Sequence, residues 1–151
     1  IGNTKTLEGC IRNYTHEEIL EHKIDVSEEG EKKKLERGKK KIEFWNLPDI
    51  LVITLKRFDK SGKKNKVFID FPLENLNLSN YVIGYDRDTY KYDLYGICNH
   101  SGGTRGGHYT SFIKNANDKW YLFNDTNVIE MTDLNKIKSP QAYCFFYRKK
   151  K

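Results

Sequence analysis

The 151-residue sequence predicts an α+β fold with a central antiparallel β-sheet and a few helices near the N-terminus. Three observations support this prediction. The main helix signals lie in residues 1–25, closely spaced apolar and aromatic segments fill the second half, and polar turns separate those segments. The length is that of one domain with a substantial core.

The N-terminal part is predicted to contain a helix that begins near Thr15. Thr15 and Glu18 have the spacing of a capping box, and Ile19 and Leu20 follow as apolar helix residues. Residues 28–41, EEGEKKKLERGKKK, contain seven Lys or Arg and four Glu, a net charge of +3. Because glutamates are interleaved with the basic residues, we expect this segment to form a solvated hairpin or a mobile loop.

Strand-like segments begin after the charged region. Ile42 and Phe44 alternate with polar residues and are expected to point inward. The most apolar run, ILVITLKRF at 50–58, is expected to be a central strand that is buried on both faces. Asn117 and Asp118 are expected to form a hairpin turn. The other predicted elements are a strand at 66–71, a loop or short helix at 73–81, and strands at 90–100, 108–115, 119–125, 127–131 and 142–149.

Composition excludes several classes of protein. The net charge of +6 suggests an anionic partner, but no aromatic side chains lie between the lysines, so we expect no nucleic-acid surface. No apolar run approaches the roughly 20 residues of a membrane span, and no signal peptide is evident. Cys10, Cys98 and Cys144 form no C-x-x-C pair, which argues against a disulfide framework and a cysteine zinc site. We expect a reducing cytosolic or nuclear location, no membrane contact, no metal and no other cofactor.

The candidate functional residues lie in and after NHSGGTRGGHYTSF, residues 99–112. Four glycines precede His108, so the backbone there can lie close to another extended chain. If one strand begins at His108 and the next strand of a hairpin ends near Asn124, the side chains of Asn124 and Asp125 lie beside the imidazole. A general base whose tautomer is fixed by an amide or carboxylate has this arrangement. A structural histidine and an ordinary strand-end turn are the alternatives.

Several longer stretches can be compared with known families. They are TLEGCIRNYTHEEIL, LPDILVITLKRF, KVFIDFPLENLNL, YDLYGICNHSGGTRGGHYTSFI, KWYLFNDTNVIEM and AYCFFYRK. Together they resemble the ubiquitin-specific protease family of cysteine deubiquitinases over nearly the whole chain. The resemblance implies a papain-like cysteine protease palm and thiol-dependent hydrolysis after the C-terminal glycine of ubiquitin. It also implies ubiquitin and ubiquitinated proteins as partners.

The resemblance gives each candidate a role. It makes His108 the catalytic general base, Asn124 the third position of the triad, and Asp125 the neighbouring acidic residue that assists. For the channel that receives the C-terminal tail of ubiquitin, it implies three sets of substrate-binding residues: Arg57 and Phe58 beside the channel, Gly106 and Gly107 in a loop at 99–107 that covers the tail, and Tyr109 on the channel wall. For Phe58 and Tyr109, plain core packing is the alternative.

Two departures from the family pattern limit what this chain is expected to do. The region matching the zinc-binding fingers, about 20–45, contains no cysteine, so we expect fingers that are reduced in size and bind no metal. The palm is expected to cover 46–151. The nucleophile box is absent, since Lys5 follows Gly-Asn-Thr where cysteine would be needed. Cys10, Cys98 and Cys144 are expected to be structural.

We therefore expect residues 1–151 to be part of a catalytic domain without its thumb, the segment that carries the nucleophile. That thumb segment would be a partner of this chain, and the chain alone is expected to be inactive because no thiolate is available to His108. A non-catalytic ubiquitin-binding or scaffold module and a protease for another ubiquitin-like modifier are the alternatives.

Overall fold

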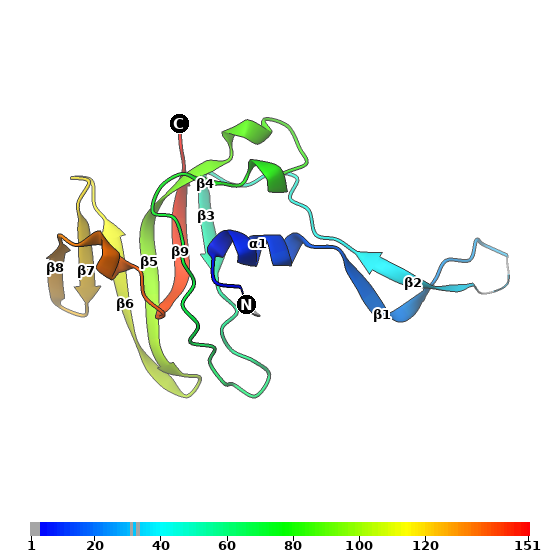
Figure 1. Ribbon diagram of the computed structural model, residues 1–151, viewed down its shortest axis with the longest axis horizontal. Coiled ribbons are helices and arrows are strands. Elements are labelled where there is room, and N and C mark those ends of the chain that lie inside the picture. The colour runs from blue at the N-terminus through cyan, green and yellow to red at the C-terminus, as the bar shows by residue number, and fades with distance from the viewer. Residues whose placement is uncertain (1–3, 31, 33) are drawn as a thin grey trace.

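The computed structural model describes residues 4–30, 32 and 34–151. A twisted, mostly antiparallel sheet forms the main body, and a two-stranded ribbon projects from it (Figure 1). The main sheet has seven strands in the order β3-β9-β5-β6-β7-β8, and β4 pairs with β5 outside this path. The elements are α1 (Leu7–Thr15), β1 (Glu18–Asp25), β2 (Leu35–Lys40), β3 (Ile50–Thr54), β4 (Leu76–Asn77), η1 (Ser79–Tyr81), η2 (Arg87–Thr89), β5 (Lys91–Gly103), β6 (Gly106–Lys114), β7 (Trp120–Asn124), β8 (Asn127–Met131), η3 (Leu134–Ile137) and β9 (Ala142–Lys149).

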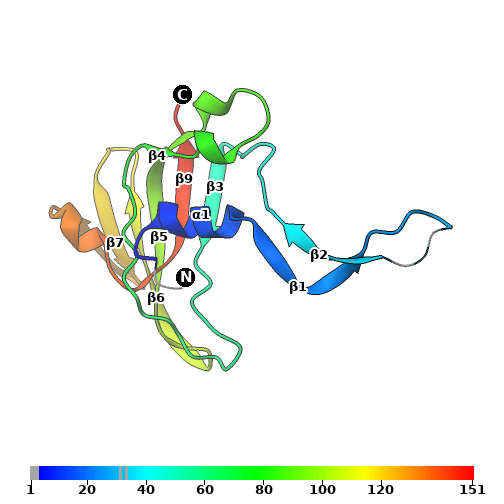
Figure 2. The same ribbon diagram turned by 45° about the vertical axis from the view of Figure 1, so that its right-hand side comes forward.

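The core lies between one face of this sheet and α1 with the coil that follows β3 (Figure 2). Leu7 of α1, Ile97 of β5 and Phe145 of β9 are completely buried in it. Phe71, from the coil, packs against Phe145 in a tilted arrangement with ring centroids 4.7 Å apart. Burial of these large apolar side chains is the main stabilising contribution to the sheet.

The prediction of a helix that starts near Thr15 is wrong, because α1 ends there. The side chain of Thr6 caps the helix by accepting a hydrogen bond from Gly9 N at 3.1 Å. The Thr15 hydroxyl donates to Ile11 O at 3.0 Å, at the opposite end of the helix. Glu18, read as part of a capping box, instead begins β1. In the part of the chain that the structure describes there is one α-helix rather than a few.

The charged segment contributes one strand of a hairpin, so the hairpin expectation for 28–41 holds only in part, and residues 31 and 33 lie outside the described residues. β1 and β2 pair antiparallel, and the ribbon begins at Glu18, earlier than predicted. It projects away from the main sheet (Figure 1). Ion pairs between Lys39 and Glu17 and between Lys40 and Glu18, each at 2.9 Å, join its strands near their base.

The prediction that 50–58 is a central strand buried on both faces is wrong. The strand β3 ends at Thr54, and in the described residues it pairs only with β9, so it lies at the edge of the sheet. Ile50 and Val52 are 43% and 51% exposed. A continuous apolar run does not distinguish a strand that is buried on both faces from an edge strand with exposed apolar side chains.

The C-terminal strands were predicted nearly residue for residue, and β9 and β8 have the expected bounds. Asp118 adopts a left-handed φ of 60° in the turn between β6 and β7, as expected for Asn-Asp. Residues 66–71 are not a regular strand: Ile69 and Phe71 are buried, but only Asp70 forms a bridge, with Thr6. Among the residues described, none of the helices has the length and apolar character that crossing a membrane requires.

Candidate active site

The predicted pair of His108 and Asn124 is brought together by two adjacent strands. His108 is the third residue of β6 and Asn124 is the last residue of β7, and Ser111 is paired with Phe123 in their register. This register makes His108 and Asn124 diagonal neighbours on one face of the sheet. The Nε2 atom of His108 lies 2.6 Å from the Oδ1 atom of Asn124.

This hydrogen bond determines the tautomer of a neutral imidazole. An amide Oδ1 can only accept, so Nε2 of His108 carries the proton and Nδ1 keeps a lone pair. Within the described residues, Nδ1 has no hydrogen-bond partner, and the side chain is 49% exposed. The arrangement can therefore take a proton from a group that approaches Nδ1 while Asn124 holds the ring from behind.

Asp125 lies at the edge of this pair rather than in it. Its Oδ2 atom is 4.0 Å from Nε2 of His108, and its side chain is 77% exposed. Asp125 has a left-handed φ of 49° in the tight turn between β7 and β8. It can stabilise a protonated His108 electrostatically, and the exposure makes this effect small.

The glycine-rich stretch was predicted to be a loop, but it is a β-hairpin. β5 and β6 stay paired as far as Gly103 and Gly106, and only Thr104 and Arg105 form the turn. Gly102 has a φ of 115°, and a Cβ there would lie 2.6 Å from Gly106 O, so this position requires glycine.

The other three glycines of this hairpin differ in their surroundings. A Cβ at Gly107 would overlap with Nε2 of His100. A Cβ at Gly103 or Gly106 would meet no heavy atom within 4 Å. Packing inside this chain therefore explains Gly107 but not Gly103 or Gly106.

Arg57 lies beneath the surface instead of lining it. The side chain is 1% exposed, and burial lowers the pKa of its guanidinium. Nε donates to Ala142 O at 2.8 Å, and Nη1 donates to the carbonyls of Asn65 and Val67 at 3.0 and 2.9 Å. Arg57 thus holds the turn at 58–67 against β9, while its buried Nη2 has no partner in the described residues.

Phe58 and Tyr109 belong to a cluster of rings around a residue that was not predicted, His100. The ring centroid of His100 is 4.6 Å from that of Tyr109, 5.9 Å from Phe58 and 5.8 Å from Tyr143. His100 is 4% exposed, whereas Tyr109 is 57% exposed and presents one side of the cluster to solvent. A two-residue turn at Thr104 would have indicated His100, because that turn places residue 100 opposite residue 109.

No cysteine is placed to serve His108. Cys98 is paired with Ser111, three residues along β6 from His108, which corresponds to about 10 Å and to the opposite face of the sheet. Cys144 lies beyond Cys98 on β9. Cys10 is in α1, and burial raises the pKa of the thiols of Cys10 and Cys98. A raised pKa lowers the thiolate fraction that nucleophilic attack requires.

An apolar groove of about 640 Å³ lies between α1 and β3. Its lining includes Ile11 and Tyr14 from the helix and the exposed Val52 from the edge strand. Among residues 4–30, 32 and 34–151 there is no group of three or more His, Cys, Asp or Glu side chains that could hold a metal ion.

Comparison with known proteins identifies the family. The profile described as Ubiquitin carboxyl-terminal hydrolase matches residues 4–147. Ubiquitin carboxyl-terminal hydrolase 8 of Arabidopsis thaliana is 46% identical over 114 residues, which cover 73% of this chain and 13% of the relative. Ubiquitin carboxyl-terminal hydrolase 12 of Saccharomyces cerevisiae is 40% identical over 149 residues, 95% of this chain and 12% of the relative.

A solved structure supports the same assignment. A chain in the SAGA Ubp8/Sgf11/Sus1/Sgf73 DUB module bound to ubiquitin aldehyde has a TM-score of 0.81 at 31% identity, covering 100% of this chain and 35% of that chain. The chain belongs to the ubiquitin carboxyl-terminal hydrolase family of thiol proteases that act as deubiquitinases. It spans about an eighth of the length of these curated relatives and about a third of the solved chain.

Proposed function

We propose that this chain is the palm and reduced fingers of a cysteine-type deubiquitinase and that it supplies the general base for hydrolysis after the C-terminal glycine of ubiquitin. The hydrogen bond of 2.6 Å between His108 Nε2 and Asn124 Oδ1 carries this proposal. It leaves Nδ1 free to take the proton of a thiol, which then attacks the carbonyl carbon of the scissile bond. The same histidine returns the proton to the leaving amine, and Asp125 supports the charged imidazolium.

The substrate tail is proposed to run past the β5–β6 hairpin. Gly103 and Gly106 leave open space beside that hairpin, and the exposed ring of Tyr109 stands next to it. A tail without side chains, such as Gly-Gly, can approach the hairpin backbone closely at these two positions. Phe58 does not contact the tail in this proposal. It packs against His100, whose ring contacts Tyr109, and Arg57 supports the turn that carries Phe58.

The nucleophile is proposed to come from a thumb segment that is not among these 151 residues. The edge strand β3 and the groove of about 640 Å³ beside α1 expose apolar side chains, including Val52 and Tyr14, that such a segment would cover. Because the three thiols do not face His108, the chain alone is expected to hydrolyse nothing. The unpaired thiols also fit a reducing cytosolic or nuclear location.

Thiol-reactive probes made from ubiquitin and from ubiquitin-like modifiers test the proposed function. We expect the ubiquitin probe to label a protein in which this chain is joined to the nucleophile-bearing segment, and to leave the 151-residue chain unlabelled. Labelling of the chain by itself would contradict the absence of a nucleophile. Labelling only by another modifier would indicate a protease of different specificity, and binding of ubiquitin without labelling would indicate a scaffold.

A further inference from the structure

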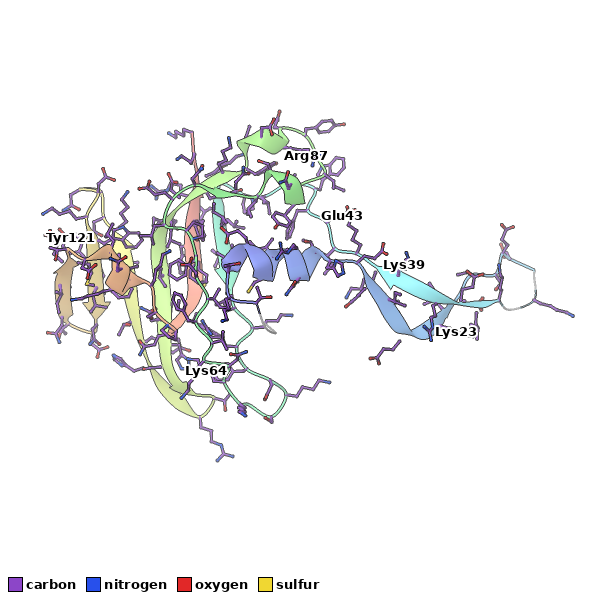
Figure 3. The ribbon with its side chains drawn as sticks, in the orientation of Figure 1. Lys23, Lys39, Glu43, Lys64, Arg87 and Tyr121 are labelled. Atoms are coloured by element: carbon purple, nitrogen blue, oxygen red, sulfur yellow. The ribbon has the colours of Figure 1, made fainter. Side chains whose placement is uncertain are left out.

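Lys64 and His100 form a contact that joins the turn at 58–67 to the β5–β6 hairpin. The Nζ atom of Lys64 lies 2.9 Å from Nδ1 of His100 and also donates to the His100 carbonyl. Figure 3 shows Lys64 on this turn, beside the end of the hairpin. At the tip of the same turn, a Cβ at Gly62 would lie 3.2 Å from the Thr104 hydroxyl, so the two tips also touch.

The surroundings of Lys64 are unusual for a lysine. Its ammonium has no carboxylate partner among the described residues; it is held by a ring nitrogen, a carbonyl and the face of Phe58, 5.8 Å from the ring centroid. Burial, and then the charges of Arg57 and Lys66, lower the pKa of Lys64. Desolvating a cation without a carboxylate is unfavourable, and such local conflicts concentrate at functional sites.

Lys64 also determines which nitrogen of His100 carries the proton. An ammonium can only donate, so Nδ1 of His100 accepts and Nε2 carries the proton. That Nε2 edge lies against Gly107, and the ring face lies against Tyr109. The imidazole of His100 is therefore packed between Lys64 on one edge and the first residues of β6 on the other.

Those residues of β6 surround the candidate base. Gly107 and Tyr109 flank His108 in the chain, and His108 is paired with Ser101, the residue after His100. Because the His100 ring packs against this backbone, we expect a displacement of the ring to shift the backbone and the His108 imidazole, which lies 2.6 Å from Asn124. Misplacement of a reacting group by about 1 Å is enough to lower a rate about 100-fold.

We propose that Lys64 is a positioning residue: by holding His100 in one tautomer and one place, it sets the start of β6 so that His108 is hydrogen-bonded to Asn124. The inference rests on the proposed function for its meaning in catalysis. Its structural part concerns only residues of this chain.

The structural part is tested on the 151-residue chain by long-range 1H–15N NMR of the histidine side chains. Wild type is expected to show His108 in the Nε2–H form. Lys64→Met should convert His108 to a mixture of tautomers, and Lys64→Arg, which keeps a cationic donor, should restore the wild-type signals. Lys66→Met removes an exposed lysine two positions away and should leave His108 unchanged. Unchanged His108 signals in Lys64→Met would overturn the proposal, whatever the protein hydrolyses.

The catalytic part is tested with the protein that joins this chain to its nucleophile, using a fluorogenic amide at the ubiquitin C-terminus. Lys64→Met should lower kcat about 10- to 100-fold while KM changes less than about threefold, since the base and not the tail is displaced. A wild-type kcat in Lys64→Met together with altered His108 signals would overturn the positioning role. If wild type hydrolyses nothing, the proposed function fails, while the NMR result still decides whether Lys64 positions His108.

A second variant covers the case in which Lys64→Met does not fold, as judged by circular dichroism. Lys64→Gln keeps an NH2 group that can donate hydrogen bonds but removes the charge, and it should shift the His108 tautomer in the same direction by a smaller amount. A change in thermal stability with wild-type His108 signals in this variant would indicate a merely structural role and would overturn the proposal.

Discussion

Gly107 lies so close to the imidazole of His100 that a Cβ at this position would overlap with the Nε2 atom of the ring. The two residues come from neighbouring strands of one hairpin, and His108 follows Gly107 directly. The glycines of the motif therefore have two separate explanations. Gly102 and Gly107 are required by the hairpin itself, whereas packing among the described residues does not account for Gly103 and Gly106, which are proposed to face the substrate tail.

Gly107→Ala should destabilise the chain by about 1–3 kcal/mol, because the added methyl group overlaps with the imidazole of His100, which is only 4% exposed. Gly106→Ala is the matched control, since open space surrounds that position, and it should stay within about 0.5 kcal/mol of wild type. Urea denaturation of both variants measures the difference. Equal urea midpoints for the two variants would show that the His100 ring moves to accommodate the methyl group, which would contradict this prediction.

Asn124→Leu should lower kcat about 100-fold in the protein that carries the nucleophile, because His108 loses the acceptor that selects its tautomer. Asn124→Asp keeps an acceptor and should retain kcat within about tenfold of wild type. Steady-state hydrolysis of a ubiquitin C-terminal amide measures both variants. A large loss in Asn124→Asp with none in Asn124→Leu would contradict the orienting role.

The stability of the chain should decrease in acid partly through His100. Burial, and then the charge of Lys64, lower the pKa of His100 below its ordinary value of 6.5, and the other titratable groups against the ring are the phenols of Tyr109 and Tyr143. The unfolded chain therefore binds the proton more readily. The stability due to neutral His100 is complete above pH 6.5 and is lost as the pH falls from there through the folded-state pKa.

Urea denaturation of wild type and His100→Gln across this pH range isolates the contribution. Glutamine can still accept from Lys64 but does not titrate, so the free energy of unfolding of the variant should depend less on pH below 6.5. Identical pH dependence in the two proteins would mean that His100 is not held neutral by its surroundings.

Val52→Lys should weaken assembly with the nucleophile-bearing segment at least tenfold, since it places a charge in the groove that this segment is proposed to cover. The stability of the 151-residue chain should change by less than about 0.5 kcal/mol because Val52 is exposed. Ile50→Lys, on the same strand but outside the groove lining, is the control. Equal affinities of the two variants for the nucleophile-bearing segment, measured by calorimetry, would exclude this groove as the binding site of that segment.

The sequence predicted the C-terminal strands because turn residues and apolar alternation bound each of them. It was enough to pair His108 with Asn124, since a single short hairpin separates them. It was misleading where one pattern fits two structures: Thr15 and Glu18 have capping-box spacing, yet Thr6 caps the helix and Thr15 ends it. Similarly, the apolar run of β3 does not reveal that the strand lies at an edge.

The contacts that support the site were beyond sequence reasoning for a different reason. Lys64 and His100 are separated by 36 positions, and neither lies in a motif that signals contact with the other. Arg57 was expected beside the channel, but its burial follows from carbonyls of β9 and of its own turn that only the folded chain brings together. Such interactions depend on packing and on register rather than on local spacing.

The most direct test of the account is the rate of ubiquitin C-terminal amide hydrolysis by the nucleophile-bearing protein with His108→Gln. If His108 is the general base, kcat should decrease at least about 100-fold while the protein still binds ubiquitin with its wild-type affinity. A His108→Gln protein that hydrolyses the substrate at the wild-type rate would contradict the central claim.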